Sequence, residues 1–291
     1  MSRSGPPPLV AGAQIAPGYA VIEHLSRGRA LDVYDAWSAS RGTRCIVKVL
    51  RPDREDDRPA TRRLLAEGRL IRRLSHPHIV RGYEVLTEPR TAVVMETLTG
   101  QTVAHLIEES DPRLPVRDIA HLGLHVGSAV RYLHAAGWLH LDLKPSNIVA
   151  EAGRAVLIDM SVARRPGRAG GGVGTWCYMA PEQVRGGDLG PAADVWGLGV
   201  VLYEALTGQA AFDPDPGDDP GSTSSSASTS SGGSRSSSAS WETSSLGTAA
   251  RDARPRRQLD GPPAPIRRLR RGAPAELVAL IDACLAPEAA D

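Results

Sequence analysis

An eight-residue polar loop, His140 to Asn147, constrains this chain more than any other segment. It places Asp142, Lys144 and Asn147 at fixed offsets, and a second carboxylate, that of Asp159, follows the next apolar run. Phosphoryl transfer needs a carboxylate that orients the attacking hydroxyl and a cation that stabilises the moving phosphoryl group. Because an amide oxygen and a second carboxylate are ligands that Mg²⁺ accepts, the loop indicates a site for this chemistry.

A lysine in an apolar strand gives an independent indication. The run from Cys45 to Leu50 is typical of a buried strand, and Lys48 lies inside it. A buried ammonium group is costly without a partner. The helix predicted over Arg62 to Leu74 places Glu67 near its apolar side. We therefore expect Lys48 and Glu67 to pair, rather than to be an ordinary strand-end lysine and a surface glutamate.

Together these segments resemble the motifs of the protein kinase family. The loop His140 to Asn147 is similar to the catalytic loop H-R-D-L-K-P-x-N, and Asp159 to Ser161 is similar to the magnesium loop D-F-G. Gly174 to Glu182 resembles the substrate-docking loop with its A-P-E motif. Asp194 to Val200 resembles the helix that anchors the catalytic loop in this family. Lys144 in the loop favours the Ser/Thr-specific kinases. Within these, the chain most resembles the bacterial eukaryotic-like type.

The resemblance implies an α+β, two-lobed protein-kinase-like fold. We expect a small β-rich N-lobe over residues 18–98 and a larger helical C-lobe over residues 99–291. Residues 1–17 are expected to be a disordered N-terminal tail. A Ser/Arg-rich insertion at about 213–265 has too few apolar residues to offset its ordering entropy, so it is expected to be disordered.

The resemblance also implies a role for each site residue. Asp142 would orient the substrate hydroxyl, and Lys144 would stabilise the transferring phosphoryl group. Mg²⁺ would be bound by Asn147 and Asp159. ATP would be held at its phosphates by Lys48, which Glu67 orients. The remaining nucleotide contacts would come from the lid, the adenine pocket and the segment between the lobes, at Gly28, Val33, Ile46, Met95, Glu96 and Leu98.

The nucleotide lid departs from the family pattern. The motif G-x-G-x-x-G-x-V aligns with Ser26 to Val33, where only Gly28 and Val33 match. Glycines allow backbone N–H groups to approach phosphate closely, so Ser26 and Leu31 predict a stiffer loop with poorer contacts. Ile46 replaces the usual small residue that covers adenine and narrows the pocket. We therefore expect weak affinity for ATP.

Two further departures concern regulation. Leu141 replaces the arginine that in this family pairs with a phosphate on the activation loop. The segment from Val162 to Gly174 contains no Ser, Thr or Tyr that could carry such a phosphate. Thr175 matches the threonine of the docking loop. The enzyme is therefore expected to need no activation-loop phosphate.

The composition limits the binding partners and the cellular location that can be expected for the chain. A net charge of +1 gives no bulk attraction to nucleic acid or to an anionic membrane. Dispersed cysteines and the absence of an apolar signal-peptide core favour the cytoplasm, and Val195 to Leu206 is too short to span a bilayer. The family places an arginine near the chain end to pair with Glu182. None is evident before Asp291, so the sequence leaves open whether the chain is a truncated fragment.

The residues leave more than one function open. A Ser/Thr protein kinase that uses ATP and Mg²⁺ is favoured because the charged groups closest to the chemistry are present. A pseudokinase that binds or scaffolds is the alternative, favoured by the degraded lid and Ile46. A kinase for small molecules is disfavoured by the docking loop. The tract Ser222 to Ser245 is either an autophosphorylation target, because tethering raises its effective concentration, or an inert linker, which is slightly favoured.

Overall fold

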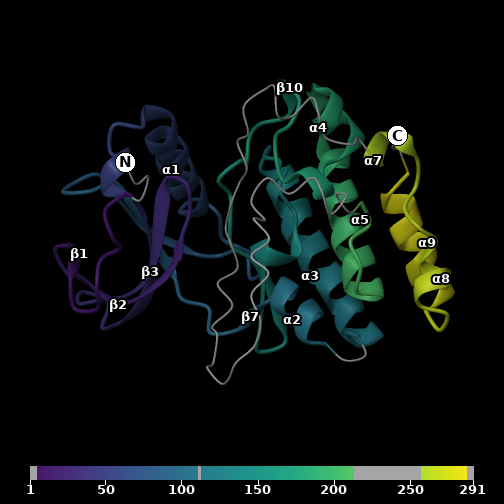
Figure 1. The fold of residues 1–291 in the computed structure, drawn as a ribbon, viewed down its shortest axis with the longest axis horizontal. Helices are drawn as coiled ribbons and strands as arrows, with labels where there is room; N and C mark the ends of the chain where they lie inside the picture. Colours follow the sequence, from purple (N-terminus) through teal and green to yellow (C-terminus); the bar gives the residue numbers. More distant parts are fainter. Residues whose placement is uncertain (1–4, 111–112, 213–256, 287–291) are drawn as a thin grey trace, which may run out of the picture.

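The computed structural model describes residues 5–110, 113–212 and 257–286. Figure 1 shows a β-rich N-terminal part in purple and blue beside a larger, mostly helical part in teal to yellow. This arrangement confirms the predicted α+β, two-lobed class. The tract Ser222 to Ser245, for which autophosphorylation was considered, lies outside the described residues.

Cross-strand pairs of apolar residues build the sheet of the N-lobe. Among the described residues this sheet has six strands in the order β1-β2-β3-β4-β6-β5. Tyr34, Val47 and Val94 are successive partners across β3, β4 and β6 and are almost completely buried, so their packing fixes the register. The strands are β1 (Gln14–Ala16), β2 (Tyr19–Arg27), β3 (Leu31–Ser38), β4 (Thr43–Leu50), β5 (Gly82–Leu86) and β6 (Ala92–Glu96).

Helix α1 (Arg58–Ile71) carries the glutamate predicted to face Lys48. The helix begins after Asp57, whose carboxylate accepts the N–H of Ala60 at 3.0 Å. Glu67 lies on the buried face of the helix together with its apolar residues. The cap therefore fixes where the helix starts, and the helical period directs Glu67 inward.

Gly68 allows α1 to lie unusually close to the sheet. A Cβ at this position would stand 2.6 Å from Val93 Cγ2 and 2.7 Å from Val85 Cγ2. Both valines belong to the strands that α1 covers. The helix thus contacts the sheet at a position that has no side chain, and this contact determines the distance between helix and sheet.

A helix that is apolar on all sides forms the centre of the C-lobe. This helix, α5 (Pro191–Thr207), is buried along most of its length and ends at Gly208, whose φ of 71° is left-handed. Helices α3 and α9 pack against it. The other helices and strands are α2 (Val103–Glu109), α3 (Val116–Ala135), α4 (Pro181–Arg185), α7 (Arg257–Asp260), α8 (Ile266–Leu269), α9 (Ala275–Cys284), β7 (Gln101–Thr102), β8 (Ile148–Glu151), β9 (Arg154–Leu157), β10 (Gly167–Ala169) and β11 (Gly187–Leu189).

The prediction of a disordered tail over residues 1–17 is wrong for its second half. Residues 14–16 form β1, which pairs with β2, and Ile15 is buried in the N-lobe core. Upstream, the amide of Leu9 donates to the hydroxyl of Tyr34 at 3.0 Å. Proline and glycine content does not reveal these contacts, because the backbone supplies the strand pairing.

The predicted insertion at about 213–265 ends earlier than expected. Its last residues form α7, in which the buried side chain of Gln258 donates to the carbonyl of Trp176 at 2.5 Å. Farther on, the hydroxyl of Tyr203 donates to the carbonyl of Ala264 at 2.8 Å. These partners are far away in the sequence, so composition alone gave the wrong boundary. Residues 213–256 lie outside the described part.

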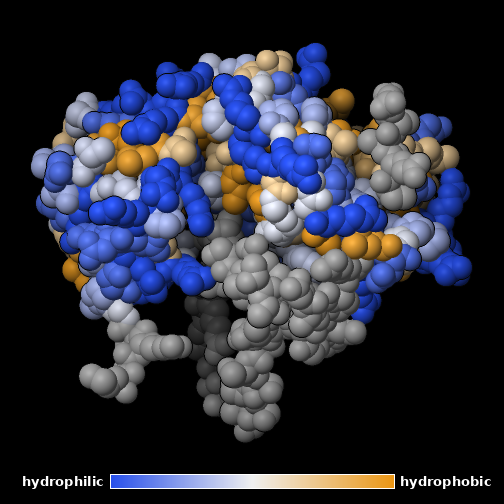
Figure 2. Space-filling model, turned by 90° about the horizontal axis from the view of Figure 1, so that it is seen from above, coloured by the Kyte–Doolittle hydropathy of each residue, from blue (hydrophilic) through white to orange (hydrophobic). Residues whose placement is uncertain are grey.

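The surface is mainly hydrophilic. Figure 2 shows hydrophilic side chains over much of one face, interrupted by smaller hydrophobic areas. In the described ranges, no helix has the length and apolar character required to cross a bilayer.

Candidate active site

The predicted Lys48–Glu67 ion pair is present. The Nζ of Lys48 lies 2.6 Å from Oε1 of Glu67 and 3.5 Å from Oδ1 of Asp159. Burial alone would lower the pKa of Lys48, but the carboxylates of Asp159 and Glu67 raise it above its ordinary value. The lysine is therefore held as a cation between the helix of one lobe and the magnesium loop of the other.

Asp159 is held as a carboxylate by the same arrangement. Burial favours its neutral form, but Lys48 and the backbone N–H of Ser161 lower its pKa below the ordinary value. The Ser161 N–H donates to Oδ1 at 2.8 Å. The side chain of Asp159 is thus kept in the ionised form, which is the form that can bind a metal cation.

The catalytic loop brings its predicted residues together around Asp142. The Nδ2 of Asn147 donates to the carbonyl of Asp142 at 2.9 Å and to its Oδ2 at 3.1 Å. The Nζ of Lys144 lies 3.3 Å from the same oxygen. The other oxygen, Oδ1, accepts the N–H of Thr175 at 2.7 Å. Both oxygens of the carboxylate are therefore oriented by fixed donors.

Thr175 joins the docking loop to this network through its side chain as well. Its Oγ1 accepts a hydrogen bond from Nζ of Lys144 at 2.8 Å. Since its N–H is bonded to Asp142, one residue of the docking loop contacts both charged groups of the catalytic loop. This position agrees with the expected docking-loop threonine.

Asp194, in the first turn of α5, holds the backbone of the catalytic loop through hydrogen bonds. Its Oδ2 accepts the N–H of His140 at 2.8 Å, and its Oδ1 accepts the N–H of Leu141 at 2.6 Å. His134 Nε2 also lies 2.8 Å from Oδ2. A buried carboxylate thus receives donors from the loop and from α3, which supplies the partners that such a group requires.

His140 is buried within the loop. Its Nδ1 accepts the N–H of Asp142 at 3.2 Å, which requires the neutral tautomer with its proton on Nε2. Burial lowers the pKa of this histidine, against the opposing effect of Asp194 and Asp142. The ring therefore supports the backbone of Asp142 as a neutral group.

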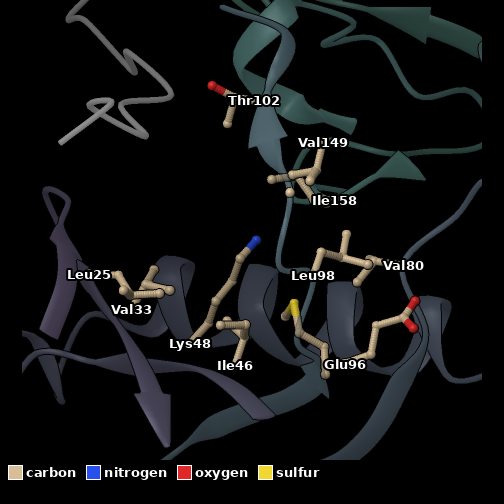
Figure 3. A pocket seen from close by; sticks show the side chains of 12 residues that line it. Leu25, Val33, Ile46, Lys48, Val80, Glu96, Leu98, Thr102, Val149 and Ile158 are labelled. Carbon is tan, nitrogen blue, oxygen red and sulfur yellow. The ribbon is translucent and has the colours of Figure 1, made fainter. Parts of the chain in front are cut away.

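A mainly apolar cavity of about 190 Å³ lies between the lobes. Figure 3 shows Lys48 extending into it, with Leu25 and Val33 on one side and Leu98, Val149 and Ile158 on the other. Of the predicted nucleotide contacts, the structure brings these to the cavity wall: Val33, Ile46, Lys48, Met95, Glu96 and Leu98. Its chemistry suits a flat, apolar ring system.

Several wall residues were not predicted from the sequence. None of them carries a charge, and several lie outside the strands, so only their place in the fold identifies them. These residues are Leu25, Val80, Gly100, Thr102, Val149 and Ile158.

The segment between the lobes offers backbone groups to the cavity. Within the described chain, the N–H of Leu98 donates no hydrogen bond. The carboxylate of Glu96 instead accepts the N–H of Arg81 at 2.8 Å, outside the cavity wall, so only the backbone of Glu96 is suited to contact a ligand.

Gly28 does not line the cavity. It lies in the turn between β2 and β3, where its N–H donates to the carbonyl of Leu31 at 2.8 Å. A Cβ there would meet only that oxygen, at 3.5 Å, so the turn does not require glycine. The geometry of the turn therefore does not support the prediction that Gly28 would donate its backbone N–H to a phosphate.

The guanidinium group of the arginine beside this turn also has hydrogen-bond partners within the protein. Arg27 forms two hydrogen bonds with the carboxylate of Asp32, at 2.8 and 2.9 Å, and donates to the carbonyl of Pro6 at 2.7 Å. In the structure it stabilises the hairpin.

The donor set fits Mg²⁺. The amide nitrogen of Asn147 is bonded to Asp142, which leaves its oxygen as the ligand atom, and Asp159 supplies an ionised oxygen. The described residues contain no group of three or more His, Cys, Asp or Glu arranged to hold a metal. Two protein oxygens suit a cation that takes its other ligands from phosphates and water.

Comparison with known proteins agrees with this arrangement. Residues 19–290 match the family model described as the protein kinase domain. The chain is 34% identical over 216 residues to a serine/threonine-protein kinase PknA of Mycobacterium tuberculosis, covering 70% of this chain and 50% of that protein. It is 32% identical over 212 residues to a probable serine/threonine-protein kinase PknB of Lactococcus lactis, covering 70% of this chain and 34% of that protein.

A third relative, a probable serine/threonine-protein kinase PknB of Bifidobacterium longum, is 32% identical over 233 residues, which are 74% of this chain and 33% of the relative. The chain thus spans between a third and a half of the length of these curated relatives. The match to the family model extends over nearly the whole chain. The chain belongs to the protein kinase family, and its relatives are bacterial kinases of the eukaryotic-like type.

Proposed function

We propose that the chain is a Ser/Thr protein kinase that transfers the γ-phosphoryl group of ATP to protein hydroxyls. The observation that carries this proposal is the continuous set of contacts from Glu67 through Lys48 to Asp159. Those contacts join the two lobes across the cavity, as phosphoryl transfer by this family requires. The printed names of the relatives support the same specificity.

In this proposal each charged group has one task. The backbone at Glu96 and Leu98 binds adenine, and Lys48 binds the α- and β-phosphates. Asp142 orients the substrate hydroxyl and receives its proton as the oxygen attacks the γ-phosphorus, and ADP leaves as the bond between that phosphorus and the bridging oxygen breaks. Lys144 stabilises the charge on the transferring group. Asn147 and Asp159 would hold Mg²⁺, which would neutralise charge on the phosphates.

The proposal includes independence from activation-loop phosphate. Thr175 contacts Asp142 and Lys144 directly, so the docking loop is already joined to the catalytic loop. Leu141 is buried and supplies no guanidinium to bind a phosphate. We expect basal activity to survive exhaustive phosphatase treatment, and Leu141→Arg to give no increase. Loss of most activity, with the responsible phosphate mapped between Asp159 and Glu182, would contradict this part.

The experiment that tests the proposed function is transfer of radiolabelled phosphate from ATP to a generic protein substrate in the presence of Mg²⁺. Asp142→Asn keeps the shape of the side chain and removes the base, so it should lower kcat by about 10³-fold or more. If the wild type and Asp142→Asn transfer phosphate equally slowly, the chain is not an active kinase.

A pseudokinase is the second candidate, and the lid is the observation that favours it. The N–H of Gly28 is bonded within the turn, and Arg27 is paired with Asp32, so neither is available to a phosphate. Calorimetry with ATP separates the two functions. An active kinase should bind ATP more tightly with Mg²⁺ than without, whereas equal affinity under both conditions favours the pseudokinase.

A further inference from the structure

Gln183 connects three segments around the catalytic loop. It lies in α4, directly after Glu182 of the A-P-E motif, and its side chain is only 2% exposed. Its Nε2 donates to the carbonyl of Leu141 at 2.9 Å and to the carbonyl of Val173 at 2.7 Å. Its Oε1 accepts the N–H of Ala180 at 3.0 Å. Both donors of the amide and its oxygen are thus used inside the protein.

The first contact holds a strained part of the catalytic loop. Leu141 has a φ of 63°, in the left-handed region that side-chain-bearing residues rarely adopt. Its N–H is bonded to Asp194, and its carbonyl is bonded to Gln183. Since Leu141 immediately precedes Asp142, fixing both of its backbone groups fixes the direction in which the catalytic carboxylate emerges.

The second contact holds the end of the activation segment, Val162 to Gly174. Val173 is followed by Gly174, whose φ of 110° is also left-handed. A Cβ at Gly174 would lie 2.4 Å from the carbonyl of Leu141 and 3.2 Å from Nε2 of Gln183. The activation segment therefore crosses directly over the amide. The next residue, Thr175, contacts the catalytic carboxylate.

A backbone hydrogen bond adds a second contact between Gln183 and the activation segment. The carbonyl of Gln183 accepts the N–H of Gly172 at 2.7 Å, so the main chain and the side chain of one residue hold Gly172 and Val173. The same segment contains no residue that could be phosphorylated. A neutral amide with two N–H donors can join two carbonyl groups for as long as the chain is folded. A phosphate instead joins N–H donors of basic groups, and only while it is attached.

We propose that Gln183 is a positioning residue that fixes the activation segment to the catalytic loop in place of a phosphate. This inference rests on the proposed kinase function and extends it to regulation. In kinases that require activation, a phosphate paired with basic groups orders this segment. Here the bonds of Gln183 to Leu141 and Val173 order it from the moment the chain folds.

Two variants test the inference. Gln183→Met keeps the length of the side chain and removes all of its hydrogen bonds. Gln183→Glu keeps an acceptor for Ala180 but directs its second carboxylate oxygen at two carbonyl oxygens. We expect each to lower kcat by about tenfold or more, because a small displacement of the catalytic group is costly. The KM for ATP should change by no more than about twofold, because Lys48 and Glu67 are not touched.

Thr207→Val is the matched control. Thr207 is equally buried, and its hydroxyl is bonded to the carbonyls of Tyr203 and Gln209 at the far end of α5. Its replacement also removes buried hydrogen bonds and lowers the melting temperature, but kcat should remain that of the wild type. All proteins are assayed well below the lowest melting temperature. If neither Gln183 variant folds, Gln183→Asn, which keeps the amide on a shorter stem, is judged by the same criteria.

Hydrogen exchange tests the inference without relying on activity. The amide of Thr175, bonded to Asp142, should exchange at least about tenfold faster in Gln183→Met than in the wild type or in Thr207→Val. Unchanged exchange together with a kcat within about twofold of the wild type would overturn the inference. So would a loss of kcat in Thr207→Val equal to that of the Gln183 variants. A wild type that transfers no phosphate would refute the proposed function, whereas the exchange result would still decide the role of Gln183.

Discussion

The nucleotide lid and the catalytic loop both contain paired charges, but the partners of these charges lie on different parts of the fold. In the lid, Arg27 is bonded to Asp32 in the adjacent strand of the same hairpin. In the catalytic loop, Asp142 is bonded to Thr175 of the docking loop, and the loop backbone is bonded to Asp194 of α5. The charges of the lid hold the hairpin and its contact with Pro6 of the N-terminal segment, whereas those of the catalytic loop hold the docking loop and α5 in one geometry with the reacting groups.

This difference indicates which property each region controls. Groups that are already paired within a hairpin offer little to a phosphate, so ATP affinity depends on the apolar cavity and Lys48. Groups that join several elements hold the reacting atoms in place, so the rate depends on the catalytic loop. Changes in the loop should therefore alter kcat strongly, and changes in the lid should alter ATP affinity weakly.

The largest effect should come from the metal and phosphate groups. Asp159→Asn and Lys48→Met should each lower phosphoryl transfer by about 10³-fold or more, because charge stabilisation is the main source of catalysis here. Asp159→Asn should weaken ATP binding mainly in the presence of Mg²⁺, since it removes an ionised ligand. Transfer assays and calorimetry with and without Mg²⁺ measure the two effects. An equal loss of affinity without Mg²⁺ would contradict the assignment of Asp159.

The next effect concerns the anchor of the catalytic loop. Asp194→Ala leaves the buried N–H groups of His140 and Leu141 without an acceptor. The free energy of unfolding should fall by about 3 kcal/mol. Chemical denaturation measures this change, and kcat should fall in the protein that remains folded. A variant of normal activity and stability would show that the loop does not depend on α5.

A smaller effect is expected at the roof of the cavity. Ile46→Ala widens the space for adenine and should tighten ATP binding by up to about tenfold. Calorimetry with adenosine provides the control, because the gain arises at the ring and should be the same without phosphates. If ATP gains affinity and adenosine does not, Ile46 acts on the lid rather than on the adenine pocket.

The smallest effect should arise in the lid. Arg27→Ala should change ATP affinity by no more than about twofold, since the guanidinium is already paired with Asp32. The same titration measures this change. A large loss of affinity would mean that Arg27 leaves Asp32 to contact phosphate, and the contrast between the two regions would disappear.

Residues whose chemistry is distinctive could be predicted from the sequence. Lys48 was identified because a charge in an apolar strand requires a partner, and Asp142 and Asn147 because their spacing is specific. Leu25 and Val149 could not be identified in this way, since an apolar residue in a cavity wall looks like any core residue. Gln183 carries no signal in the sequence either, because its importance depends on two carbonyl groups that the fold brings to it.

The boundaries of the fold show the same limit. β1 and α7 lie in segments whose composition suggests no structure, and both are held by partners far away in the sequence. Backbone pairing and single buried side chains, such as Gln258, leave no periodic pattern. The apolar residues from Pro191 to Gly208, by contrast, predict a buried helix that ends at a glycine, and α5 occupies Pro191–Thr207.

Gly68 allows the smallest spacing between α1 and the sheet of the N-lobe. The next residue toward the N-terminus, Glu67, reaches Lys48 only because α1 lies against Val85 and Val93 without an intervening methyl group. Any side chain at position 68 would act as a wedge that pushes the helix outward and carries the glutamate away from its lysine. The separation of the ion pair is therefore coupled to the spacing between helix and sheet, so a change in this packing contact would alter the nucleotide site without replacing any group of the site itself.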